Sequence, residues 1–93
     1  MSKLLDADEV AAAVKSIPAW NLSGKSIERE FKLADFAAAL AFVNKVGAAA
    51  EAADHHPDIL IHDWNKVKIT LSTHSAGGLT ANDFKLAREI DRL

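Results

Sequence analysis

The sequence predicts an α+β fold in which one four-stranded antiparallel sheet carries helices packed on one face. Alanine-rich stretches with helical spacing of apolar residues are separated by short runs in which apolar and polar residues alternate, in the order α-β-β-α-β-β-α. With 93 residues the chain has room for one core, so we expect a single domain over residues 1–93. The other face of the sheet must then be solvated or shared with a partner.

The first helix is expected over about residues 7–16. Asp6 can form a capping box with Glu9, three residues further on, and a proline follows the predicted end of the helix. Residues 20–22 predict a short strand that turns into a second strand over residues 26–33, because polar and glycine positions separate the two.

A long second helix is expected to begin after Asp35, a favourable N-cap residue, and to end near Asp54. Pro57 sets this end because it disfavours helical geometry at the residue before it. One stripe with helical spacing is expected to face the sheet: Phe36, Leu40, Val43, Gly47 and Ala50. The small residues Gly47 and Ala50 are expected to allow a close approach.

A hairpin and a last helix complete the predicted fold. The hairpin consists of residues 58–62, a turn at 63–65 and residues 66–73, with alternate apolar side chains pointing inward at Val67, Ile69 and Leu71. Thr80 with Asp83 three residues on predicts the capping box of the last helix. Its apolar face is expected to comprise Phe84, Leu86, Ala87, Ile90 and Leu93.

Composition excludes several classes of function. A net charge of −2 with scattered basic residues gives no reason to expect direct binding of nucleic acid. The absence of cysteine excludes disulfides and cysteine-based metal sites, and is compatible with a reducing cytoplasm. The longest uninterrupted apolar run, residues 36–43, is far shorter than the roughly 20 residues that span a bilayer, so no membrane segment is expected.

Three of the four histidines fall in two short stretches at the ends of predicted elements. His55 and His56 follow the second helix, and His74 follows the last strand. Histidine can give and take protons near neutral pH, because its unperturbed pKa is about 6.5. We therefore expect a cleft with acid–base chemistry between the helix exit and the strand end. His62 lies outside this pattern and is interpreted as a solvated strand residue.

Two other kinds of site are disfavoured, a metal site and a serine nucleophile. His56, His62 and His74 with Asp63 could offer three nitrogens and a carboxylate to a metal ion, but their spacing matches no usual zinc pattern. Ser72 and Ser75 lie beside His74, yet no strand-to-helix nucleophile elbow is present.

Three positions have simple structural interpretations. Trp20 and Trp64 are expected to fill the core or an interface. Gly78 is expected to supply backbone freedom for the turn after His74.

The histidines belong to a longer pattern that resembles a known family. The pattern comprises Glu51, Asp54-His55-His56-Pro57-Asp58, Asn65-Lys66-Val67, Thr73-His74, Gly78-Leu79-Thr80, Asp83 and Leu86-Ala87. It resembles the pterin-4a-carbinolamine dehydratases, also known as dimerisation cofactors of a hepatocyte transcription factor. The match is strong over the C-terminal half and rests on element order over the N-terminal half.

The resemblance implies an enzyme that removes water from 4a-hydroxytetrahydropterin to give quinonoid dihydropterin, in tetrahydrobiopterin recycling, with no metal or organic cofactor. His55, His56 and His74 would be the catalytic histidines, with proton transfer assigned first to His56 and His74. The residues that it places against the pterin are Asp54, His55, His56, Ser72, Thr73, His74 and Ser75. Glu51, Pro57 and Asp83 would support and orient the histidines. A homodimer or homotetramer is also implied.

One departure and one alternative accompany this resemblance. The chain carries one residue more than family members between Pro57 and Asn65, in the predicted turn near Asp63-Trp64, which puts assembly contacts there in doubt. The alternative function is a non-catalytic dimerisation or binding module of the same fold.

Overall fold

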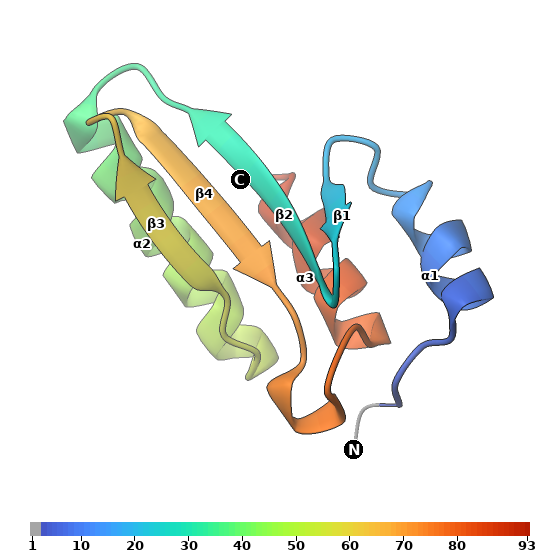
Figure 1. The fold of residues 1–93 in the computed structure, drawn as a ribbon. Helices are drawn as coiled ribbons and strands as arrows, with labels where there is room; N and C mark the ends of the chain where they lie inside the picture. Colours follow the sequence, from blue (N-terminus) through green and yellow to red (C-terminus); the bar gives the residue numbers. More distant parts are fainter. Residues whose placement is uncertain (1–2) are drawn as a thin grey trace.

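Four antiparallel strands form one sheet in the order β1-β2-β4-β3, and this confirms the predicted α+β fold (Figure 1). The computed structural model describes residues 3–93. The elements are α1 (Ala7–Val14), β1 (Asn21–Ser23), β2 (Ser26–Lys32), α2 (Phe36–Ala53), β3 (Asp58–His62), β4 (Lys66–Leu71), the short 3-10 helix η1 (His74–Ala76) and α3 (Ala81–Ile90).

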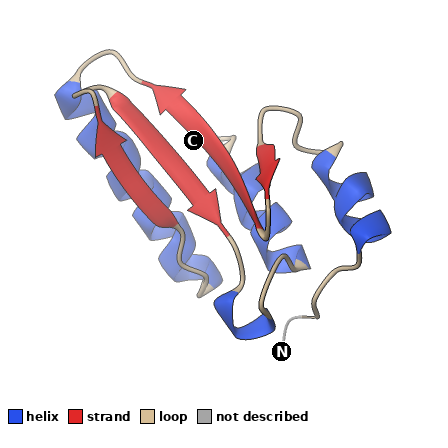
Figure 2. Cartoon of the chain, in the orientation of Figure 1, coloured by secondary structure: helices blue, strands red, loops and turns tan. Residues whose placement is uncertain are grey.

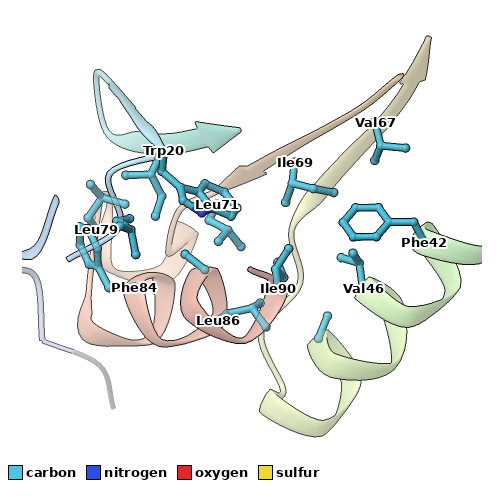
Figure 3. Close-up of a cluster of buried hydrophobic side chains, with 14 of the residues drawn as sticks. Trp20, Phe42, Val46, Val67, Ile69, Leu71, Leu79, Phe84, Leu86 and Ile90 are labelled. Carbon is cyan, nitrogen blue, oxygen red and sulfur yellow. The ribbon is translucent and has the colours of Figure 1, made fainter. Parts of the chain in front are cut away.

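Helices α2 and α3 cover one face of the sheet, whereas α1 lies beyond its β1 end (Figures 1 and 2). The core fills the space between the sheet and these helices. As predicted, alternate residues of the central strand β4 point into it, and Val67, Ile69 and Leu71 are fully buried. Phe42 and Val46 of α2, and Phe84, Leu86 and Ile90 of α3, pack against them (Figure 3).

The opposite face of the sheet carries mostly polar and charged side chains. Lys68 of β4 forms an ion pair with Glu28 of β2 at 3.3 Å. His62 of β3 pairs with Glu30 of β2 at 2.5 Å across the intervening β4. His62 was predicted to be solvated. It is instead half-buried and pairs with a charged residue on this face.

The predicted helix starts are confirmed by their capping bonds. Asp6 and Glu9 form a reciprocal capping box at α1. Asp35 accepts a 2.7 Å hydrogen bond from the backbone of Ala38 at the start of α2. These bonds satisfy amide groups that have no partner inside the helix, which is why the chain turns helical there.

The prediction for the buried face of α2 was wrong in part, although Ala50 is buried and Val43 packs against the core as predicted. The residues that face the sheet are Ala39, Phe42, Val46 and Ala50, whereas Phe36 and Leu40 are 50% and 43% exposed. Helix α2 is apolar on both sides, so helical spacing alone does not identify the side that faces the sheet. A Cβ added to Gly47 would meet nothing within 4 Å, so Gly47 allows no close approach to the sheet.

Two smaller predictions, for Leu93 and Gly78, also need correction. Leu93 lies beyond the end of α3 and is 47% exposed, so it is outside the core. The backbone freedom after His74 is used at Gly77, which has φ +76°, and not at Gly78. Trp20 belongs to the core, but Trp64 is 61% exposed in the hairpin turn, which leaves only the predicted interface role for it.

Helix α2 passes a test of length and composition for a membrane span, in contrast to the sequence expectation. Its 18-residue window has a mean hydropathy of 1.3, and 22% of that window is buried. Asn44, Lys45 and Glu51 interrupt the apolar residues of α2, so the longest uninterrupted apolar run is shorter than the helix. A core helix of a soluble protein passes the same test, so this single helix is weak evidence for a membrane.

Candidate active site

Helix α2 ends in a left-handed residue that directs the histidine pair out of the helix. Asp54 has φ 49° and ψ 43°, a conformation that aspartate tolerates better than most residues. Its backbone N–H donates to the carbonyls of Ala50 and Glu51, and the N–H of His55 donates to Ala50 at 3.1 Å. The chain then leaves the helix axis, and Pro57 follows before β3 begins.

His55 faces inward and contacts a buried carboxylate on α3. Its Nε2 lies 2.5 Å from Oδ1 of Asp83, and the two residues are 28 positions apart in the chain. The side chain of His55 is 11% exposed and that of Asp83 is 0% exposed. This contact joins the exit of α2 to the first turn of α3.

Two threonines complete the surroundings of Asp83. The hydroxyl of Thr73 donates to Oδ2 of Asp83 at 2.8 Å, and the backbone N–H of Thr80 donates to the same oxygen at 2.9 Å. The two threonine hydroxyls lie 2.8 Å apart. Asp83 and Thr80 also form the predicted capping box of α3. Among residues 3–93, every buried side-chain nitrogen and oxygen has a hydrogen-bond partner, which a buried carboxylate requires.

Thr73 also holds the loop that carries His74. Its backbone carbonyl accepts hydrogen bonds from Ala76 and Gly77 at 3.1 and 3.0 Å, and its N–H donates to Gly78 at 2.8 Å. These bonds form η1, which presents the exposed ring of His74. Within the described residues His74 forms no ion pair, unlike the other three histidines. The α2–β3 connection and η1 lie at the same end of the molecule (Figure 1).

The remaining residues named from the sequence lie around these two loops. His56 is exposed and pairs with the exposed Glu51. Asp54 and Ser75 are exposed, while Pro57 and Ser72 are half-buried. Thr73 is buried, and its hydroxyl is engaged by Asp83. Thr80 was not among the predicted site residues. Its sequence pattern predicts the capping box of α3, but it contains no information on the contact of its hydroxyl with Thr73.

A cavity lined by the N-terminal segment contains no histidine in its lining. It has a volume of about 360 Å³ and lies between the N-terminal segment, the β1–β2 turn and the Gly77-Gly78-Leu79 segment. Its lining is mainly apolar and includes no histidine, so we assign the candidate chemistry to the histidine loops. Among residues 3–93 no three His, Asp or Glu side chains are grouped to hold a metal ion.

Comparison with known proteins shows the family of the chain. The family model for pterin 4 alpha carbinolamine dehydratase matches residues 3–93. The chain belongs to this family. Its members are named as dehydratases, which are hydro-lyases. A Nocardia farcinica protein with that family name is 50% identical over 92 residues, covering 99% of this chain and 96% of the relative. A Cyanothece relative is also 50% identical, covering 100% of this chain and 95% of its own length.

Two solved structures share the fold. A transcriptional coactivator/pterin dehydratase from Brucella melitensis superimposes with a TM-score of 0.87 at 36% identity, covering 95% of both chains. A pterin dehydratase-like protein, described as a RuBisCO assembly factor in the alpha-carboxysome, has a TM-score of 0.66 at 25% identity. It covers 80% of this chain and 87% of its own.

Proposed function

We propose that this protein dehydrates 4a-hydroxytetrahydropterin to quinonoid dihydropterin, as part of tetrahydrobiopterin recycling. The observation that carries the proposal is the shared anchor of the two histidine loops. Asp83 contacts His55 directly and bonds Thr73, the residue that precedes His74. Family membership supports the substrate class, and a cytoplasmic site of action is compatible with a chain that contains no cysteine.

The reaction needs one proton donor and one proton acceptor. The hydroxyl on carbon 4a leaves as water when its C–O bond breaks and an imidazolium supplies a proton. A neutral imidazole takes the proton from the neighbouring ring nitrogen, whose electron pair forms the new C=N bond. Proton transfers of this kind typically contribute 10²–10⁴-fold in rate. His55, His56 and His74 supply these roles in our proposal, and no metal or organic cofactor takes part.

The residues around the histidines would hold the pterin in this proposal. The edge of a pterin offers both hydrogen-bond donors and acceptors. Asp54, Ser72 and Ser75 would meet this edge with side-chain oxygens, and backbone groups of Thr73 and His74 would add further contacts. The buried hydroxyl of Thr73 is engaged by Asp83, so in this proposal Thr73 contributes through its backbone.

The direct test is the rate of 4a-hydroxytetrahydropterin dehydration, with the substrate generated by a coupled aromatic amino acid hydroxylase and followed by absorbance. We expect purified protein to accelerate the absorbance change in proportion to its concentration. A folded protein that leaves the uncatalysed rate unchanged would refute the proposed activity.

A second candidate function is a binding module that serves another protein. The observation that favours it is the set of exposed large apolar side chains Phe36 and Leu40 on α2 and Leu60 on β3. The fold also occurs in a protein described as a RuBisCO assembly factor. An inactive, folded protein that associates through these side chains would favour this function over catalysis.

A further inference from the structure

We propose that the hydroxyl groups of Thr73 and Thr80 act as positioning groups that fix the proton of neutral His55 on Nε2. Nδ1 of His55 is then the nitrogen that accepts a proton from the pterin. This inference rests on the proposed function for the identity of the reactant. The position of the proton itself follows from the geometry around Asp83.

The direction of each hydrogen bond in the cluster follows from the number of protons available. Thr73 gives its single hydroxyl proton to Oδ2 of Asp83. The contact between the two threonine hydroxyls must therefore use the proton of Thr80. The backbone N–H of Thr80 also donates to Oδ2. Oδ2 thus accepts two hydrogen bonds, and Oδ1 remains to face Nε2 of His55.

This pattern selects one tautomer of the imidazole. Two donors already point at Oδ2, so a carboxyl proton has no favourable place there. The proton between Oδ1 and Nε2 resides on the ring, because an imidazole nitrogen is more basic than a carboxylate oxygen, and His55 therefore donates from Nε2 to Asp83. A neutral imidazole carries one N–H, so Nδ1 holds the free electron pair. The proton-accepting atom of His55 is therefore determined by the side chains around it and not by the substrate.

Because both threonines are buried, water cannot easily take over the hydrogen bonds of their hydroxyl groups. Thr80 is 1% exposed and Thr73 is 6% exposed. Removing the Thr80 hydroxyl would leave Thr73 without its donor inside the protein. Because the backbone of Thr73 also holds η1, the same loss would disturb the position of His74. We therefore expect the threonines to affect the chemical step more than substrate affinity.

The proton position can be measured without a substrate. Nitrogen NMR of the full chain labelled with ¹⁵N-histidine distinguishes a protonated ring nitrogen from an unprotonated one, and His→Gln variants assign the four rings. At a pH where His55 is neutral, we expect Nε2 to carry the proton and Nδ1 to carry none. A spectrum with the proton on Nδ1 would overturn the inference.

Asp83→Asn gives a sharper form of the same test. Thr73 and the N–H of Thr80 both donate, so the amide oxygen must face them and the NH₂ group must face Nε2 of His55. Nε2 must then accept, and the proton must move to Nδ1. We expect the ring signals to exchange and kcat to fall at least about tenfold, as occurs when a paired aspartate no longer selects the working tautomer. An unchanged tautomer in this variant, if it is folded, would refute the inference.

Thr80 is tested by a matched series. Thr80→Val removes the donor to the Thr73 hydroxyl but keeps both donors to Oδ2, so we expect it to lower kcat about tenfold with KM within about twofold. Thr80→Ser should restore kcat. Thr70→Val, the same change on the opposite face of the sheet, should leave kcat unchanged. A Thr80→Val protein with full kcat would remove Thr80 from the positioning role.

The two proposals fail in different ways. An active enzyme whose His55 carries the proton on Nδ1 would overturn this inference and leave the proposed function standing. A folded protein with the proton on Nε2 but no dehydratase activity would overturn the proposed function and, with it, the assignment of Nδ1 as the atom that meets the pterin.

Discussion

His56 and Glu51 form an ion pair on the surface, with 2.5 Å between Nε2 and Oε2. Their side chains are 62% and 76% exposed. The neighbouring pair of His55 and Asp83 has the same chemical groups but is almost completely buried. The two adjacent histidines therefore differ in the exposure of their carboxylate partners to solvent. Their neighbouring positions in the sequence do not reveal this difference.

Glu51→Gln should have only a small effect on dehydration. Exposed ion pairs contribute about 0–1 kcal/mol because water and salt screen them, so we expect kcat/KM to stay within about fivefold of the wild-type value. Steady-state kinetics at low and high salt provide the measurement. A loss of about 100-fold would mean that Glu51 takes part in the chemistry, contrary to its exposed position.

His74→Ala should abolish most of the catalysed rate while the protein stays folded. The ring is exposed and makes no ion pair within residues 3–93, so its removal should change the free energy of unfolding by no more than about 0.5 kcal/mol. The rate should fall about 10²–10⁴-fold if the ring transfers a proton. Coupled dehydration assays and urea denaturation measure the two quantities.

His62→Ala is the matched control for this experiment. His62 is also a histidine, but it lies on the outer face of the sheet, where it pairs with Glu30. We expect its removal to leave dehydration unchanged. Full activity in His74→Ala, or equal losses in both variants, would contradict the assigned role of His74.

The sequence predicted which loops carry the histidines, but not how deeply each ring is buried. Residue types at fixed offsets made His55, His56 and His74 the candidate site residues, because those offsets lie along the chain itself. The contact of His55 with Asp83 depends on how α3 packs against the exit of α2, which only the folded chain defines. The part of Thr80 in this cluster was missed for the same reason.

The fold was predictable wherever one local pattern was unambiguous. Alternation in β4 assigned Val67 and Ile69 to the core, and these residues are fully buried. Helix α2 was ambiguous because apolar residues occur on both of its sides, and the choice between Phe36 and Phe42 depended on which side met the sheet. Local spacing contains no information on that choice.

Phe42→Ala and Phe36→Ala test the corrected face of α2 with the same chemical change. Phe42 packs in the core and Phe36 is half exposed. We expect Phe42→Ala to lower the free energy of unfolding by about 3–5 kcal/mol, and Phe36→Ala to lower it by less than about 1 kcal/mol. Guanidinium denaturation of both variants, at a concentration where light scattering gives them the same mass, provides the comparison. Similar losses in the two variants would show that both sides of α2 are buried in solution.

Self-association should occur through the exposed side of α2 and not through the uncovered face of the sheet. The uncovered sheet face carries ion pairs such as Lys68 with Glu28. Helix α2 instead exposes Phe36 and Leu40, and contiguous exposed apolar side chains favour association with another protein surface. Light scattering at micromolar concentration should therefore give at least twice the chain mass of 10.0 kDa.

A pair of charge substitutions separates α2 from other exposed apolar positions. Leu40→Lys should shift the protein to a monomer, because association would bury the new ammonium group without a partner. Leu22→Lys makes the same change at another exposed leucine, on β1, and should leave the mass unchanged. A wild-type monomer would contradict self-association altogether. An oligomer that survives Leu40→Lys but dissociates with Leu22→Lys would move the interface from α2 to the β1 side of the molecule.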